Sequence, residues 1–136
     1  MANNPSDIQL INELDRTKTD AWKELRLVEK EMTDEDRHVK WTGGENTFSY
    51  PIYSKRVNQA TSLLSTIGAI TPLYPWMANG LPDDSPAEEL SAADAIRAAT
   101  YIVRSERFGD GAIAKAAEIG LLDGILRSLI HWYDEG

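Results

Sequence analysis

The chain has 136 residues, 42% of them hydrophobic, which is the size of one domain with its own core. Its net charge of −8, from 14 basic and 22 acidic side chains, argues against binding to the phosphate backbone of DNA or RNA. The chain contains no cysteine, which excludes disulfides and cysteine-ligated metals and favours a cytoplasmic location. No segment has the apolar length of a membrane span or the pattern of a signal peptide, so we expect neither membrane insertion nor export by that route.

Two amphipathic helices are expected within residues 1–37. Ser6, followed three residues later by Gln9, has the spacing of a capping box and predicts the start of the first helix. The second helix begins near Asp20, and its apolar residues recur every three or four positions. The charged run from Asp34 to His38 lacks the spacing of a calcium loop, so we interpret it as a solvated surface and expect no metal site. The apolar stripe of the second helix consists of Trp22, Leu25, Val28 and Met32.

Residues 38–53 are expected to be extended, and their alternation of apolar and polar side chains predicts a small hairpin near residues 38–52. Pro51, which cannot donate a backbone hydrogen bond, is expected to border the ladder. The apolar residues on the two sides of its Gly-rich turn are Val39 and Trp41, then Phe48, Tyr50 and Ile52.

The middle of the chain continues with a helix and a loop. A helix is expected over residues 54–68, with Ser54 as its N-cap and Gly68 as its end. The segment 69–86 is rich in proline, which predicts a loop that carries aromatic residues.

Residues 87–136 are expected to form a C-terminal helical half. One helix begins after Ser91 and runs to about Arg107, and Asp110 is the expected N-cap of a short alanine-rich helix that Gly120 ends. In the final helix, which contains Leu122, Ile125, Leu129 and Trp132, the spacing predicts that Asp123 pairs with Arg127 on the solvent face. The fold class is therefore predicted to be mainly α: a compact single-domain bundle of five or six short helices with a minor hairpin.

The segment from Arg104 to Gly111 resembles a hallmark, R-x-E-R-F-x-E-G, of an uncharacterised bacterial family that is a domain of unknown function. In that family a small helix, a glycine and an I-L-x-x-L ending follow, and Trp41, the Tyr50–Ser54 stretch and Trp76 also lie in the family's order. The resemblance covers about the last two thirds of the chain and implies a helical architecture and a bacterial or phage origin, but no reaction. Asp110 stands where the family has glutamate. The matching residues are Arg104, Glu106, Arg107, Phe108, Gly111, Glu118, Gly120, Ile125, Leu126 and Leu129.

Two arginines of this segment are the best candidates for a binding site. Arg104 and Arg107 are spaced to lie on one helix face, close to the backbone N–H groups of the next helix around Asp110 and Gly111. Together these groups could hold a carboxylate or a phosphate. The alternative, which we favour, is a structural network in which acidic side chains neutralise the arginines and Asp110 caps the next helix. The acidic side chains expected in this network are Glu106 and Glu118.

The sequence predicts no catalytic residue and no cofactor, because it contains neither a nucleophile elbow nor a phosphate-binding loop. Its four tryptophans and five tyrosines are expected mainly in the core, with Trp76, Trp132 and Tyr74 as an interaction surface. We therefore expect an acidic, non-enzymatic interaction or regulatory protein of bacterial, phage or mobile-element origin that binds a protein partner or a second copy of itself. The alternative is a small-molecule or anion-binding protein, or an enzyme, that uses Arg104, Arg107 and the Gly109–Gly111 turn. In that alternative the wall of the site is Tyr50, Tyr53 or Trp76.

Overall fold

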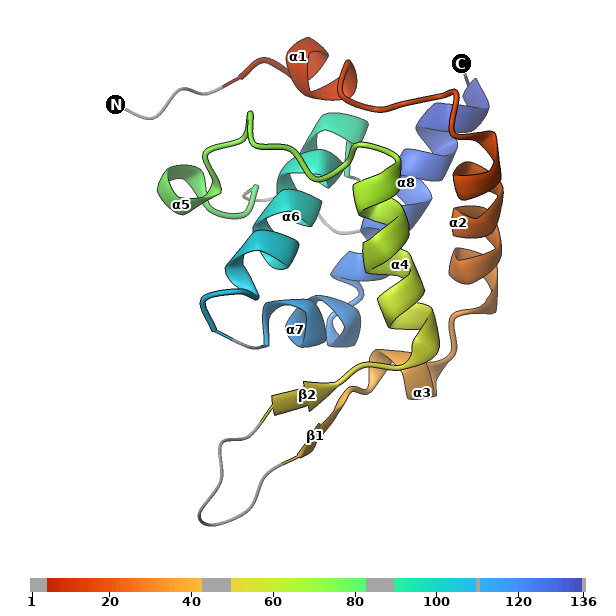
Figure 1. The fold of residues 1–136 in the computed structure, drawn as a ribbon, viewed down its shortest axis with the longest axis vertical. Helices are drawn as coiled ribbons and strands as arrows, with labels where there is room; N and C mark the ends of the chain where they lie inside the picture. Colours follow the sequence, from red (N-terminus) through yellow and green to blue (C-terminus); the bar gives the residue numbers. More distant parts are fainter. Residues whose placement is uncertain (1–4, 43–49, 83–89, 110, 136) are drawn as a thin grey trace.

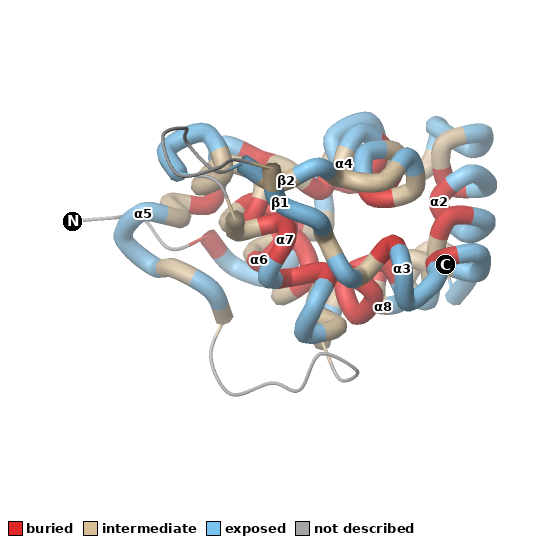
Figure 2. The backbone as a smooth tube through the Cα atoms, turned by 90° about the horizontal axis from the view of Figure 1, so that it is seen from below, coloured by how far each residue is buried: buried red, intermediate tan, exposed pale blue. Residues whose placement is uncertain are grey.

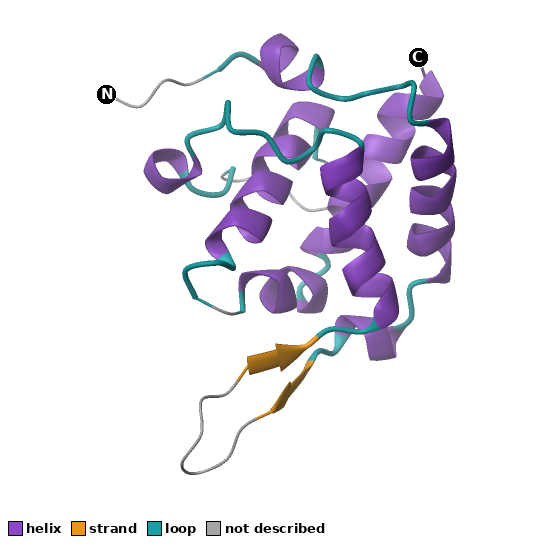
Figure 3. Ribbon diagram, viewed as in Figure 1, coloured by secondary structure: helices purple, strands orange, loops and turns teal. Residues whose placement is uncertain are grey.

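The computed structural model describes residues 5–42, 50–82, 90–109 and 111–135. Within these ranges the chain forms eight helices and two short strands, so the predicted mainly α fold with a minor hairpin is confirmed (Figures 1 and 3). In chain order they are α1 (Asp7–Ile11), α2 (Thr19–Glu31), α3 (Asp34–Arg37), β1 (Lys40–Thr42), β2 (Tyr50–Ile52), α4 (Lys55–Thr66), α5 (Trp76–Asn79), α6 (Ala92–Ser105), α7 (Ala112–Glu118) and α8 (Leu121–Glu135).

The described helices outnumber the predicted five or six because two of them are single turns. α3 has four residues and lies where the sequence predicted a charged surface run. α5 also has four residues and lies within the predicted proline-rich loop. Neither has the length that an apolar periodicity needs to be recognised.

Side-chain caps start several helices where the sequence predicts. The Ser6 hydroxyl accepts a hydrogen bond from the Gln9 N–H, and the Gln9 side chain accepts one from the Ser6 N–H, which completes the capping box of α1. The hydroxyls of Ser54 and Ser91 cap α4 and α6 in the same way, without the reciprocal bond. These serines are local signals, and each predicted helix start is confirmed to within one or two residues.

The predicted hairpin is confirmed as an antiparallel pair in which Trp41 lies opposite Pro51. Pro51 is therefore within β2 and not at its border. A ladder of two strands has a free edge on both sides, and proline is tolerated at such edges. Phe48 and the turn lie outside the described residues. The hairpin extends away from the helices, beyond α3 and the first turn of α4 (Figure 1).

The core lies between the long helices: α8 packs against α2, α6 and α7, and α2 packs against α4 (Figure 2). Many alanines of α6 and α7 are buried, which lets the helix backbones approach α8 closely. None of the described helices has the combination of length and apolar character needed to cross a membrane. The largest side chains that are fully buried include Trp22, Leu25, Leu64, Ile96, Ile102, Ile125 and Leu126.

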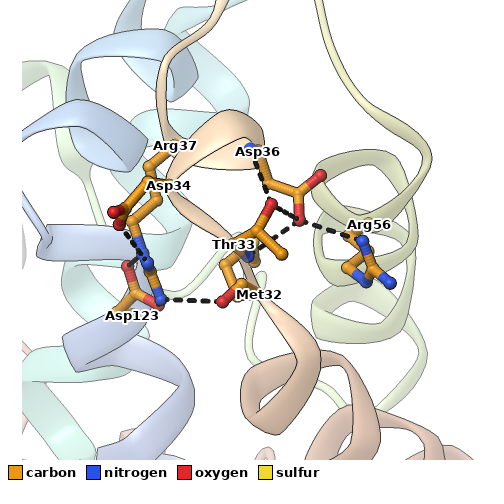
Figure 4. A network of polar contacts seen from close by, with 7 residues as sticks. All are labelled: Met32, Thr33, Asp34, Asp36, Arg37, Arg56 and Asp123. Carbon is orange, nitrogen blue, oxygen red and sulfur yellow. Dashed lines mark hydrogen bonds and ion pairs between the residues drawn. The ribbon is translucent and has the colours of Figure 1, made fainter.

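The charged run after α2 is solvated only in part: Asp34, Glu35 and His38 are exposed as predicted, but Asp36 and Arg37 anchor the run in the fold (Figure 4). Asp36 is 7% exposed, and its carboxylate accepts hydrogen bonds from the Thr33 N–H at 2.9 Å and from Arg56 at 3.2 Å. Burial alone would raise the pKa of Asp36, but the hydrogen bonds from Thr33, Ser54 and Arg56 hold it below its ordinary value. The carboxylate therefore stays ionised and ties α3 to α4.

Asp123 pairs with Arg37 of α3 and not with Arg127, which corrects the predicted pair on the solvent face of α8. The Arg37 Nε and Nη2 atoms donate to the two Asp123 carboxylate oxygens at 2.9 and 3.2 Å. Asp123 is only 5% exposed, whereas Arg127 is exposed. The hydrogen bond to Asp123 raises the pKa of Arg37 above its ordinary value.

Candidate functional site

The turn between α6 and α7 is held together by the carboxylate of Glu106. Its Oε2 accepts a hydrogen bond from the Tyr53 hydroxyl at 2.6 Å. Its Oε1 accepts from the N–H groups of Gly111 and Ile113, at 3.2 and 3.0 Å. The first N–H groups of a helix have no partner within the helix, so a carboxylate at this position satisfies them. Glu106 thus connects the end of the hairpin, the end of α6 and the start of α7.

This geometry corrects two roles expected from the sequence. Glu106 does not neutralise the arginines but caps α7, the role that was expected of Asp110. Asp110 itself lies outside the described residues, and Gly111, with φ at +121°, is the N-cap residue. The Gly111 N–H already bonds to the Glu106 carboxylate, so this donor is not free for the anion site considered from the sequence.

Arg104 and Arg107 do not share a helix face, because α6 ends at Ser105. Arg104 lies in the last turn of α6, and the Arg107 N–H bonds to the Arg104 carbonyl at 3.3 Å in the tighter turn that follows. Neither guanidinium forms an ion pair or a hydrogen bond with another described residue. Glu118, the other acid expected to neutralise them, is exposed at the end of α7.

A second arginine of α6 shows what a neutralised guanidinium looks like in this protein. Arg97 and Arg104 are seven positions apart, which places them on the same helix face. Arg97 bonds to Asp7 at 2.7 Å and to Asp94 at 2.8 Å. The positive charge of Arg97, at one end of this face, is therefore compensated. No described acid compensates the positive charge of Arg104 at the other end.

Aromatic and sulfur-containing side chains lie beside Arg104. Trp76 of α5 packs against Tyr101 of α6, with ring centroids 5.9 Å apart, and against Phe108, with centroids 5.8 Å apart. Phe108 is nevertheless 74% exposed, and Met77 is 72% exposed. Phe108 and Met77 therefore expose a large apolar area to solvent, which is unusual for large apolar side chains on a protein surface.

Trp41 brings the hairpin to the same turn. An ideal Cβ on Gly111 would lie 3.2 Å from Cη2 of Trp41, so the indole rests directly on the backbone of the turn. α5, the α6–α7 turn and the hairpin lie along one side of the molecule (Figure 1). We call this surface the arginine–aromatic face and define it by Trp41, Trp76, Met77, Arg104, Arg107 and Phe108.

An open pocket of about 460 Å³ lies between α5 and the end of α6, next to this face. Arg104 is the one charged side chain among its described lining residues, and prolines and aromatic rings form most of the rest. The lining consists of Thr71, Pro72, Tyr74, Pro75, Trp76, Met77, Ala78 and Arg104.

The three aromatic residues expected to form one interaction surface lie in different places. Trp76 is on the arginine–aromatic face, but Tyr74 is 4% exposed and its hydroxyl donates to the Gly80 carbonyl. Trp132 lies near the end of α8, where its ring centroid is 5.8 Å from that of Trp22. The guanidinium of Arg16 covers the Trp132 ring at 3.9 Å. Sequence reasoning did not place Phe108 and Met77 on an exposed surface, and periodicity carries no such signal in a turn or in a one-turn helix.

Replacing Glu106 by alanine is expected to lower the free energy of unfolding by about 2 kcal/mol, because α7 and the Tyr53 hydroxyl lose their common acceptor. Urea denaturation followed by circular dichroism measures the loss. Glu118→Ala is the matched control: this glutamate is exposed at the other end of the same helix and should have little effect. Equal losses in the two variants would contradict the capping role of Glu106.

Comparison with known proteins identifies a family. Residues 17–135 match the model of DUF6508, a family of unknown function. The match begins at residue 17, so it includes much of the N-terminal part that the resemblance did not cover. No curated protein and no solved structure matches the chain. The predicted resemblance to a family of unknown function is confirmed. Because the family model covers most of the length of the chain, the chain belongs to the DUF6508 family.

Proposed function

We propose that the protein is a non-enzymatic protein-interaction domain that binds its partner through the arginine–aromatic face. The observation that carries this proposal is the exposure of Phe108 and Met77, 74% and 72%, beside two arginines that lack a described partner. Arginine, methionine and aromatic residues are enriched in protein interfaces, and a few such anchors supply most of the binding energy.

The α6–α7 turn needs some residues for its structure and not others. Glu106 and Gly111 make the contacts that hold the turn. Arg104, Arg107 and Phe108 add little to the buried core, so their side chains are available to a partner.

The net charge of −8 supports a protein partner over a nucleic acid. The cysteine-free sequence supports a cytoplasmic setting, and the family resemblance supports a bacterial or phage origin.

Photo-crosslinking in the native cells tests the proposal. A benzophenone amino acid at Met77 is expected to give a discrete adduct, either with another protein or with a second copy of this chain. The matched control carries the same probe at Leu27, an α2 residue that is 51% exposed and lies outside the face. The Met77 adduct should disappear when Arg104→Ala and Arg107→Ala are added. No adduct at Met77, or the same adducts from both positions, would contradict the proposal.

A second candidate function is the binding of a small anionic molecule in the pocket between α5 and α6. The observation that favours it is the lining of this pocket: among the described lining residues, Arg104 is charged and the others are apolar or uncharged. Native mass spectrometry of the gently isolated protein tests it. A small ligand mass that is retained by the parent protein and lost in Arg104→Ala would support this function over protein binding.

A further inference from the structure

We infer that the pocket between α5 and α6, through Arg104, recognises an acidic segment of a partner protein in which a carboxylate adjoins an aliphatic or aromatic side chain. This inference rests on the proposed interaction function and adds the chemistry of the partner. It follows from two properties of the site that occur side by side, an apolar wall and an arginine without a described acid.

The apolar half of the site is built to accept a side chain. Pro72, Pro75 and Trp76 line the pocket, which is open to solvent and has a volume of about 460 Å³. Proline has a fixed φ, and Trp76 is held edge-on against Tyr101 with an interplanar angle of 82°. A wall that is already ordered loses little conformational entropy when an apolar side chain packs on it.

The charged half of the site is suited to a carboxylate. Arg104 lines the same pocket, and Arg107 follows it in the turn. An arginine guanidinium can bind both oxygens of a carboxylate, and such a pair is stronger beside apolar groups than in open water. The protein uses this geometry internally, because Arg37 binds Asp123 through two nitrogens. Arg104 has no such acid among the residues that the structure describes, so its guanidinium is available to the carboxylate of a partner.

The overall charge limits how acidic that partner segment can be. With a net charge of −8, the protein repels a ligand roughly in proportion to the negative charges the ligand carries. A contact between one carboxylate and one arginine is short-ranged, and at physiological salt the more distant charges are screened beyond about 8 Å. A segment with one or two carboxylates among apolar residues therefore fits this surface, and a polyanion such as a nucleic acid does not.

Selection from a random-peptide phage library against the full chain tests the inference. Enriched peptides are expected to contain aspartate or glutamate next to an aliphatic or aromatic residue. With Arg104→Glu the selection should shift from acidic to basic peptides, and the acidic peptides should bind more than about tenfold more weakly. Arg104 has no described structural partner, so the variant is expected to fold, and Arg104→Gln, which removes the charge alone, should weaken the same peptides.

The matched control is Arg127→Glu, because Arg127 is exposed on α8, forms no ion pair with a described residue, and lies outside the arginine–aromatic face. This variant should select the same acidic peptides as the parent protein. Peptides that need Trp76 but show no preference for acidic residues would overturn the inference and leave the proposed interaction function intact. A selection in which no peptide depends on Arg104 or Trp76 would also overturn it, whereas the interaction function is judged separately by the Met77 crosslink.

Discussion

Replacing Asp123 by alanine is expected to lower the free energy of unfolding by about 3 kcal/mol, which corresponds to a fall in Tm of about 10 °C for a domain of this size. The Asp123 carboxylate is buried and binds the Arg37 guanidinium through two hydrogen bonds. Its removal leaves the positive charge of Arg37, whose side chain is only 32% exposed, without its main partner. The breaking of such a pair is costly because the remaining charge stays partly desolvated.

Thermal and urea unfolding of Asp123→Ala measure this loss. The matched control is Asp134→Ala, which also removes an aspartate of α8 from an arginine pair, but the side chains of Arg26 and Asp134 are 48% and 44% exposed. Such exposed pairs contribute little to stability, so the control should unfold almost like the parent protein. The double variant Arg37→Ala, Asp123→Ala should lose less than the sum of the two single variants. Equal effects of Asp123→Ala and Asp134→Ala would contradict the structural role of the buried pair.

The same network positions the arginine–aromatic face. α3 is tied to α8 by Arg37 and Asp123 on one side, and to α4 by Asp36 and Arg56 on the other (Figure 4). The strand β1, which carries Trp41, follows α3 after only two residues. The direction of the hairpin therefore depends on how α3 is held. We expect variants of this network to disturb the contact between Trp41 and the α6–α7 turn as well as the global stability.

Local sequence signals predicted the helices well because a cap involves residues only a few positions apart. Ser6, Ser54 and Ser91 each accept a hydrogen bond from an N–H three residues later. Gly68 and Gly120 end their helices with positive φ, a conformation that glycine adopts without strain. The one-turn helices α3 and α5 were not predicted, because four residues are too few to show a helical period of apolar side chains.

Charged partners were not predictable from spacing. Asp123 has an arginine four residues later, which favours a local pair, yet its partner is Arg37, 86 positions away. Many acids and bases share the same spacings, and only the packing of the helices decides which of them meet. Glu106 is a similar case, since the sequence suggested an arginine partner and the structure gives it backbone N–H groups and the Tyr53 hydroxyl.

The candidate site was predictable in part. The alternative hypothesis from the sequence placed Arg104 in an anion or ligand site and named Trp76 as one of three possible walls, and the favoured hypothesis placed Trp76 on an interaction surface. The structure brings both to one pocket, because α5 packs against α6. The sequence placed Trp132 on the same interaction surface, but Trp22 packs against the Trp132 ring and the Arg16 guanidinium covers it. Tertiary packing, which the sequence pattern does not specify, separates these two tryptophans.

Gly68→Ala is expected to lower the free energy of unfolding by about 3 to 4 kcal/mol, a loss as large as that of Asp123→Ala or larger. A Cβ at this position would lie 2.1 Å from the carbonyl oxygen of Glu13, and the contact is with backbone, which cannot rotate away as a side chain would. Gly68 also has φ at +90°, so alanine is strained there even without the clash. A hydrogen bond holds the segment that contains Glu13 against the segment that contains Gly68: the Asp15 N–H donates to the Ile67 carbonyl at 2.9 Å.

Two other glycines separate the clash from the strain. Gly120 has a φ of +85° and open space around its Cβ position, so Gly120→Ala should lose only the strain energy, about 1 kcal/mol. Gly109 has open space and no positive φ, so Gly109→Ala should change stability by less than about 0.5 kcal/mol. Urea unfolding of the three variants should rank them Gly68, Gly120, Gly109, and a loss at Gly68 no larger than at Gly120 would contradict the close approach of the Glu13 backbone. Because Gly68 leads directly into the segment that forms the pocket, its replacement should also weaken peptide binding at Arg104.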